Sequence, residues 1–488
     1  MPVNIISTAF VKGLDAVPHI DQFAKVTLCI SSTYLLKRYF NGTKSKADKP
    51  MASKVIMVTG GTSGIGAEVV RELAKRGAQV IILTQHAPSD PFLVDYIEDL
   101  RRETENQLVY AEQCDLASLY SVRKFATRWI DNKPVRRLDM LVLCGNVVNP
   151  SKKPKWTIDG LDEEWQINYL ANYHLLSILS PALRAQPPDR DVRVIISTCS
   201  SYIGGTLDFK TLDARTMPQR KTQTKSSSTT ATTKNTSSPS TTTKVTPKSE
   251  ASKNKKKKQP TKSTFKPYTP KPRVSNMYST SKLALMIFAH AFQQHLESFD
   301  RPDKHVNNAQ VHIVDPGFTR TPGMRRYLTG GSLWSLLLYL ITWPIWWLFL
   351  KDPIQGAQSI LTACMDDGLS AEAIHAAGAA EKLGMTREEI EAQPYKPGQG
   401  VSGLKIIKEC RERDIARREI GDLEVSKKLW EYSQKQIEEK EKEGAILRAL
   451  EKRERELLEA QEKAKAESTA VKEKTPGSRR SRKAEGDK

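Results

Sequence analysis

The sequence Thr59-Gly-Gly-Thr-Ser-Gly-Ile-Gly66 lies between a short apolar run, residues 54–59, and an amphipathic helical pattern, residues 67–76. Glycine allows the backbone to turn tightly and to approach a phosphate closely. The N–H groups at the start of a following helix favour the pyrophosphate of a dinucleotide. Because a buried strand precedes the glycines and a helix follows them, the stretch predicts a dinucleotide-binding turn rather than a purely structural one.

The alternation of strand and helix continues along the chain. Gly77 ends the first helical pattern, a second buried strand is expected at 79–83, and another helical pattern covers about 91–105. Further strand candidates are 108–112, 140–143, 192–196 and 311–314. Continuous apolar strands that alternate with helices are typical of a parallel sheet covered on both faces. We predict an α/β fold, a Rossmann-type doubly wound parallel sheet, as a single domain over 51–212 and 269–433.

Two charged or polar segments depart from this alternation. Residues 213–268 are rich in Ser, Thr, Lys and Pro and nearly devoid of aliphatic side chains. They cannot bury enough apolar surface to offset their ordering entropy, so a disordered insertion within the domain is predicted. Residues 434–488 are dense in Glu, Lys, Arg and Ala with a broken apolar stripe, which predicts a charged helical or disordered tail. A solvated helix is favoured there over a strong coiled coil, and the tail is a candidate surface for a protein partner.

Two apolar segments suggest a lipid surface. Residues 333–350 contain no charged side chain, and their 18 residues reach the lower limit for a spanning helix. Pro344 interrupts the segment and three tryptophans cluster near it, which favours a bent, monotopic insertion into one leaflet. An ordinary buried helix over the substrate pocket is the alternative. In the N-terminal segment, 1–50, the apolar run 26–36 is too short to span, so an interfacial anchor or a plain helix is expected.

The net charge and the cysteines limit the remaining functional classes. The net charge of +20 is concentrated around 253–258 and in the last 80 or so residues. These tracts are expected to be solvated, or drawn to anionic headgroups; since no aromatics interleave with the lysines, specific nucleic-acid binding is not predicted. The six cysteines show no CxxC or paired spacing, which favours a reducing compartment without disulfides. No catalytic metal is expected.

A second chemical motif, Tyr278-Ser-Thr-Ser-Lys282, follows the insertion. Residues four apart share one helical face. A free phenol has a pKa of about 10, and a lysine cation held nearby lowers it toward a useful range. With the glycine stretch upstream and Asp315-Pro-Gly-Phe-Thr319 downstream, the motif predicts a phenol that acts as acid and base.

The residues after the second strand bear on the choice of cofactor. An acidic side chain there would bind the ribose 2′-OH of NAD and repel a 2′-phosphate. The chain has Leu83-Thr-Gln-His86 and no carboxylate before Asp90. NADP(H) is therefore the predicted cofactor, with Arg76 or His86 as candidate partners of its 2′-phosphate.

Together these motifs resemble the short-chain dehydrogenase/reductase family, in its retinol-dehydrogenase-like branch, over about 54–212 and 270–433. The apolar segment and layout are also similar to those of fungal lipid-droplet oxidoreductases. The resemblance implies a seven-stranded sheet and a catalytic set of Tyr278, Lys282, Ser200 and Asn168, with Asn168 holding a proton-relay water through the lysine. The residues that it implies for cofactor binding are Gly60, Thr62, Ser63, Gly64, Ile65, Gly66, Asp115, Tyr278, Lys282, Val314 and Thr319.

Two positions depart from the family pattern. The family's Asn-Asn-Ala-Gly after the fourth strand is replaced by Leu143-Cys-Gly-Asn146, which removes the usual side-chain bracing of the sheet. Strict alignment of the fifth strand places Cys199 where the serine normally falls. Since a thiol is a weak donor, Ser200 is predicted as the catalytic serine after a one-residue slip, with Ser197 and Ser201 close by.

These features predict an NADP-dependent oxidoreductase acting on CH-OH groups. Its substrate is expected to be a lipophilic alcohol, ketone or aldehyde such as a retinoid, steroid or other lipid. The expected location is the cytosol-facing surface of the endoplasmic reticulum membrane or of a lipid droplet. The alternative is a weakly catalytic or non-catalytic membrane scaffold that binds cofactor.

Overall fold

The computed structural model describes residues 20–134, 136–150, 154–214, 216, 277–305, 307–371, 373 and 405–473. In this part of the chain one sheet runs in the order β3-β2-β1-β4-β5-β6-β7-β8. Its strands are β1 (Val55–Thr59), β2 (Gln79–Thr84), β3 (Val109–Gln113), β4 (Met140–Leu143), β5 (Val192–Ser197), β6 (Ala309–Asp315), β7 (Ile406–Lys408) and β8 (Arg411–Arg413). Every pairing is parallel except that of β8 with β7.

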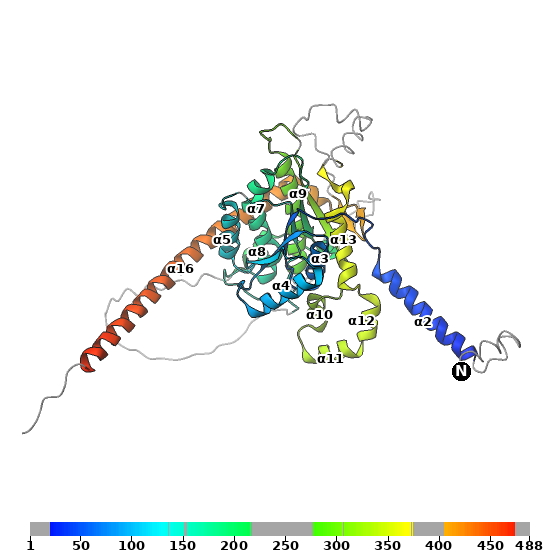
Figure 1. Cartoon of the computed structure of the whole chain (residues 1–488), viewed down its shortest axis with the longest axis horizontal. Helices are drawn as coiled ribbons and strands as arrows, with labels where there is room; N and C mark the ends of the chain where they lie inside the picture. Colours follow the sequence, from blue (N-terminus) through cyan, green and yellow to red (C-terminus); the bar gives the residue numbers. More distant parts are fainter. Residues whose placement is uncertain are drawn as a thin grey trace, which may run out of the picture. The chain divides into compact units, whose positions relative to one another are not determined.

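The predicted doubly wound sheet is confirmed, because the order reverses between β1 and β4 and helices cover both faces (Figure 1). The resemblance implied seven strands, and the eighth is the short antiparallel partner of β7. The helices of one face are α5 (Leu119–Ile130), α7 (Ala171–Arg184), α9 (Met277–Glu297) and the first part of α16 (Leu423–Glu473). Those of the other face are α3 (Gly64–Lys75), α4 (Pro91–Thr104) and α13 (Pro353–Met365).

Alternating side chains of each strand supply the two cores. On β1, Met57 lies in the core beneath α5, α7 and α9, while Ile56 and Val58 lie in the core beneath α3 and α13. This alternation follows from the two-residue period of a strand, and burial on both faces explains why the strands are continuously apolar.

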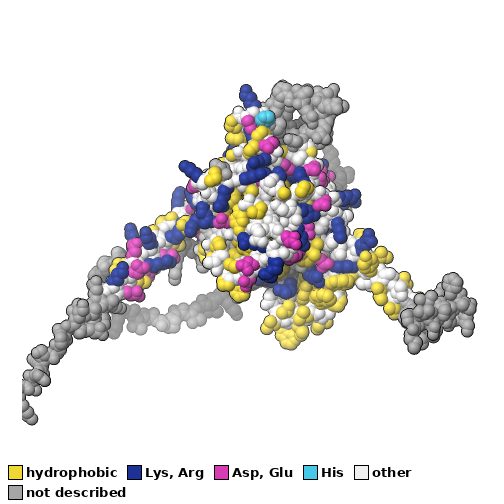
Figure 2. Space-filling model, in the orientation of Figure 1, with side chains coloured by type: hydrophobic (Ala, Val, Ile, Leu, Met, Phe, Trp, Pro, Cys, Tyr) yellow, Lys and Arg dark blue, Asp and Glu magenta, His cyan; other side chains and the backbone are white. Residues whose placement is uncertain are grey.

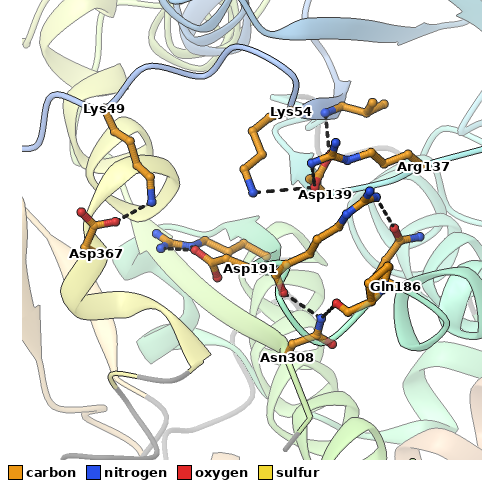
Figure 3. Close-up of polar contacts among 12 residues, drawn as sticks. Lys49, Lys54, Arg137, Asp139, Gln186, Asp191, Asn308 and Asp367 are labelled. Atoms are coloured by element: carbon orange, nitrogen blue, oxygen red, sulfur yellow. Dashed lines mark hydrogen bonds and ion pairs between the residues drawn. The ribbon is translucent and has the colours of Figure 1, made fainter. Parts of the chain in front are cut away.

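Polar contacts fasten the amino edge of the sheet (Figure 3). Asp139, just before β4, is fully buried and accepts from the Val55 N–H at 2.8 Å and from Arg137 at 2.8 Å. Asn308, just before β6, donates to the carbonyls of Pro187 and Arg190. A buried carboxylate is tolerated when it is paired and hydrogen-bonded, as Asp139 is. These contacts fix the starts of the strands at the edge opposite the glycine stretch.

The predicted boundaries need adjustment at three places. Met51 is fully buried and Ala47 packs against the same core, so the domain begins several residues before 51. The predicted disordered insertion, 213–268, begins in the last residues of α8 (Phe209–Ala214) and, apart from residue 216, otherwise lies outside the described residues.

The C-terminal tail, predicted from 434, begins inside α16. This helix is continuous from Leu423 to Glu473, and Ser433 and Ile437 are buried on it. Residues 449–463 of α16 are exposed, in agreement with the solvated helix that was predicted. Residues 474–488 lie outside the described part of the chain.

Two further helical segments correspond to the apolar stretches. Residues 333–350 form α11 (Leu333–Ile341) and α12 (Trp343–Phe349), separated at Thr342, so the predicted bend is present. The N-terminal segment contains α2 (Ile20–Asn41), and residues 1–19 lie outside the described part. Among the described helices, none has both the length and the hydropathy required to cross a bilayer.

Candidate active site

The glycine turn joins the carboxyl end of β1 to the start of α3. Gly60 and Gly64 have φ of +67° and +62°, a region that side chains other than glycine rarely adopt. A Cβ at Gly66 would overlap the carbonyl oxygen of Gly60, and a Cβ at Gly60 would lie 2.9 Å from the backbone of Gly145. Ser63 caps α3 without a side-chain hydrogen bond, so the first N–H groups of the helix are available to a phosphate. Thr62 and Ile65 complete this turn between the glycines.

The loops after β4 and β6 meet this turn. Gly145 N donates to the Thr59 Oγ1 at 3.0 Å, which ties the loop after β4 to the end of β1. A Cβ at Gly64 would lie 3.3 Å from the Thr321 Cγ2, so the loop after β6 closes the other side. Val314 is buried at the end of β6, and Thr319 is buried where its hydroxyl donates to the Gly317 carbonyl at 3.3 Å. The predicted cofactor segments therefore converge at one edge of the sheet.

Tyr278 and Lys282 enter this edge from the first turns of α9. The Tyr278 Oη accepts from the Asn146 Nδ2 at 3.1 Å and from the Cys199 thiol at 3.3 Å. The Lys282 Nζ donates to the Ser197 carbonyl at 3.2 Å and lies 5.8 Å from the centroid of the Tyr278 ring. The Tyr278 phenol, the Lys282 side chain and the glycine turn thus lie at the carboxyl edge of the sheet, where open α/β folds bind their ligands.

Comparison with known proteins agrees with the fold and the site described above. Residues 54–206 match the family model described as short chain dehydrogenase. The chain is 37% identical to "Uncharacterized oxidoreductase pbr1" of Schizosaccharomyces pombe, over 91% of this chain and 97% of that protein. It is 26% identical to human retinol dehydrogenase 13, over 66% of this chain and 76% of the relative, and 24% identical to human polyprenol dehydrogenase, over 68% and 78%.

The chain belongs to the short-chain dehydrogenase family. The resemblance to its retinol-dehydrogenase-like branch is confirmed, and the protein is an oxidoreductase by family.

The catalytic serine predicted for this dehydrogenase is not where the structure places a partner for the phenol. The Ser200 Oγ donates to the Asp315 Oδ2 at 2.6 Å and accepts from the Lys408 Nζ at 2.9 Å, so it is held away from Tyr278. The assumed one-residue slip does not occur, because Thr198 N donates to the Val314 carbonyl at 2.8 Å and keeps the strand register past the end of β5.

Cys199 occupies the position beside Tyr278 instead, as strict alignment of the strand indicated. Its sulfur also lies 2.8 Å from the Ser201 Oγ. The dehydrogenase therefore presents a thiol where its family presents a hydroxyl.

Asn168 lies in a π-helical turn, Gln166–Leu170, and is fully buried. Its Oδ1 accepts from the Val147 N–H at 2.8 Å and its Nδ2 donates to the Val147 carbonyl at 2.9 Å. Because both ends of the amide bind the same residue, Asn168 holds the loop after β4 in place. Such single π turns are frequent at functional sites.

The pKa values of the two central groups are set by burial. Burial raises the pKa of the Tyr278 phenol, with the nearby Cys199 acting in the same direction. Burial also lowers the pKa of the Lys282 ammonium. We expected the lysine to lower the pKa of the phenol, but desolvation dominates here, since Lys282 is buried and Tyr278 is partly buried.

The two groups considered for cofactor selection lie at opposite ends of β2, Arg76 before it and His86 after it. Arg76 follows the last turn of α3, where it pairs with Glu72 and lies 3.3 Å from the Asp48 carboxylate, so the proposed contact with a 2′-phosphate is wrong. His86 follows β2, and its Nδ1 lies 3.1 Å from the Asp90 Oδ2 with 52% of the side chain exposed. Beyond β3, the Asp115 carboxylate accepts from the Ala117 N–H at 2.9 Å and shapes the loop that leads to α5.

Sequence reasoning missed one member of the site. Asn146 was noted only as a departure from the family pattern, yet its amide reaches the phenol oxygen. The available signal was the position of Asn146, one residue after Gly145, which packs on the glycine turn. No sequence spacing links Asn146 to Tyr278.

Proposed function

We propose that this dehydrogenase uses NADP(H) to interconvert a lipophilic alcohol and its ketone or aldehyde at the surface of a membrane or lipid droplet. The observation that carries the proposal is the meeting of Tyr278, Lys282 and the glycine turn at one edge of the sheet. When bound there, the nicotinamide would supply or accept the hydride. The glycine turn would hold the pyrophosphate, and Lys282 would hold the nicotinamide ribose.

Tyr278 is the acid and base of this proposal. In reduction its Oη proton passes to the carbonyl oxygen of the substrate, and in oxidation the phenolate takes the hydroxyl proton back. A general acid must be protonated at working pH, and burial of the phenol favours the protonated form.

The preference for NADP(H) is supported by the way Asp90 is used. Its Oδ1 accepts from the Phe92 N–H at 3.1 Å as the N-cap of α4, and its Oδ2 faces His86. The first carboxylate after β2 is therefore engaged in capping a helix, and it is not free to select the ribose 2′-hydroxyl of NAD.

A lipid surface is supported by the exposed apolar side chains of α11 and α12. Figure 2 shows hydrophobic side chains gathered over these helices. Trp334 is 81% exposed and Leu333 is 83% exposed, and only Tyr339 of α11 is buried. The alternative of a buried helix over the pocket does not fit these values. An apolar patch of this size on a folded protein calls for an apolar partner.

The N-terminal helix α2 contacts α12, the second of these two apolar helices. The Lys37 Nζ donates to the carbonyls of Trp347 and Leu350 at 2.6 and 2.9 Å, and the rings of Phe40 and Phe349 lie 4.8 Å apart. α10 (Pro322–Thr329) connects the loop after β6 to α11, so the exposed apolar helices follow directly on a loop that borders the site.

Purified protein with NADPH or NADH and a panel of lipophilic ketones and aldehydes tests the chemistry, with Tyr278→Phe as the inactive control. Flotation with neutral liposomes, comparing the wild type with Trp334→Ser and Ile341→Ser, tests the surface. If the protein turned over only hydrophilic carbonyls, added as a comparison set, the proposed chemistry would be contradicted. If a variant carrying both Trp334→Ser and Ile341→Ser floated as well as the wild type, the proposed surface would be contradicted. Imaging of the tagged protein tests the endoplasmic reticulum or lipid-droplet location.

The thiol at Cys199 favours a second candidate, a weakly catalytic membrane scaffold with α16 as its partner-binding element. If cells tolerate Tyr278→Phe but not removal of residues 437–488, the scaffold is the better description.

A further inference from the structure

The oxygen of Tyr278 has its acceptor capacity filled. A phenol oxygen carries one proton and can accept hydrogen bonds through its lone pairs. The Asn146 Nδ2 donates to it at 3.1 Å and the Cys199 Sγ donates at 3.3 Å. With both donors in place, the phenol's own proton is the group left to meet a substrate.

The two donors come from separate loops, one after β4 and one after β5. Asn146 is exposed, and among the described residues Tyr278 is the hydrogen-bond partner that its side chain reaches. Its amide is therefore directed to the reacting oxygen and does not brace the fold. Both positions are also those at which the chain departs from the pattern of its family.

The other charged and titratable groups around Tyr278 do not take this place. The Lys282 Nζ is directed to the Ser197 carbonyl, and Cys199, Cys144 and Asp315 act on that lysine. Glu164 acts on the phenol from α6 (Glu163–Trp165), and its negative charge opposes a phenolate. Cys199 also opposes a phenolate, so among these groups the phenol oxygen depends on the Asn146 amide for stabilisation of negative charge.

We propose that the Asn146 amide is the donor that stabilises the Tyr278 phenolate as its proton passes to the substrate. The inference rests on the proposed function. In reduction, a nicotinamide held at the glycine turn would supply the hydride for the carbonyl carbon and would be oxidised by that transfer. The phenol proton joins the carbonyl oxygen, and the electron pair of the O–H bond remains on Tyr278 as the charge that Asn146 stabilises. Oxidation of the alcohol runs through the same arrangement in reverse.

Asn146→Asp is the sharpest test, because it keeps the shape of the side chain and replaces the donor with a carboxylate. We expect kcat for carbonyl reduction to fall roughly ten- to hundredfold, the range for loss of a hydrogen bond to a charged group, while KM and NADPH binding stay within about twofold. Asn146→Ala should fall about tenfold. Asn132→Ala, in the segment between α5 and β4, is the matched control and should equal the wild type.

A readout independent of turnover uses the protein without cofactor. With fluorotyrosine at position 278, the ¹⁹F signal reports ionisation of that phenol directly. Asn146→Asp should raise its pKa by about one unit or more, whereas Cys199→Ala, which removes a group that opposes the phenolate, should not raise it.

The outcomes separate the two levels of the proposal. If Tyr278→Phe is inactive but Asn146→Asp matches the wild type in turnover and in the ¹⁹F titration, the proposed role of Asn146 is refuted and the oxidoreductase function stands. If Tyr278→Phe retains full turnover, the proposed function itself fails.

Discussion

Acid should destabilise this dehydrogenase through a histidine buried in its central sheet. His312 lies on β6 with 6% of its surface exposed, and its Nε2 has no hydrogen-bond partner among the described residues. Burial, reinforced by the nearby Arg193 cation, lowers the pKa of His312 to about 4. The unfolded chain binds the proton first, at its ordinary pKa near 6.5. The stability that His312 contributes in its neutral form is therefore complete above pH 6.5 and is lost as the pH falls toward 4.

The size of the loss follows from the two pKa values. A difference of about 2.5 pKa units corresponds to a loss of about 3.4 kcal/mol in the free energy of unfolding at a pH well below both values. At pH 4.5 about 2.5 kcal/mol of this stability is lost. Other carboxylates titrate in the same window, so the informative quantity is a comparison with His312→Gln, which removes the titration. Between pH 7.5 and pH 4.5 the free energy of unfolding of the wild type should fall about 2.5 kcal/mol further than that of the variant.

Urea denaturation followed by tryptophan fluorescence at the two pH values measures this difference. If wild type and His312→Gln lose equal stability on acidification, His312 is not held neutral in the sheet and the reasoning is wrong. A larger loss in the variant would have the same consequence.

Three further predictions concern the glycine turn, the cofactor and α16. Gly66→Ala places a Cβ against the Gly60 carbonyl, so NADPH affinity measured by fluorescence should fall at least about tenfold while far-UV circular dichroism is unchanged. Arg76→Ala should leave the ratio of turnover with NADPH and NADH within about twofold, because Arg76 pairs with Glu72 and Asp48; a marked shift toward NADH would contradict its placement. Trp430→Ala should lower the free energy of unfolding by about 3 kcal/mol in urea titrations, since its ring packs on two aromatic residues of α7 and α9, and a cost below about 1 kcal/mol would mean that α16 does not dock there.

The central fold could be predicted because its signals are local. The glycine turn, β1 and α3 adjoin in sequence, and burial on both faces leaves the strands continuously apolar. The hairpin of β7 and β8 gave no such signal, since Arg411–Arg413 is charged throughout and pairs only along one edge.

The site could be predicted only in part, for the same physical reason. Tyr278 and Lys282 are neighbours on a helix, but the contact between Asn146 and Tyr278 joins residues 132 apart. The error at Ser200 came from placing the chemistry of a good donor above the register of the strand, which backbone hydrogen bonds determine. The burial of Ser433 was missed because its hydrogen-bond partner, Tyr169 in the π-helical turn, is 264 residues away in the sequence.

The attachment of α2 to α12 has a consequence for how the protein is made. Lys37 and its acceptor on Trp347 are 310 residues apart. At ~5–20 residues per second, synthesis of the intervening chain takes roughly 15–60 s. Throughout that interval the nascent helix has no α12 to lie against, and Lys37 has neither of its two carbonyl acceptors. The attachment of α2 to the domain is therefore a late step, which can occur only after α12 has been made.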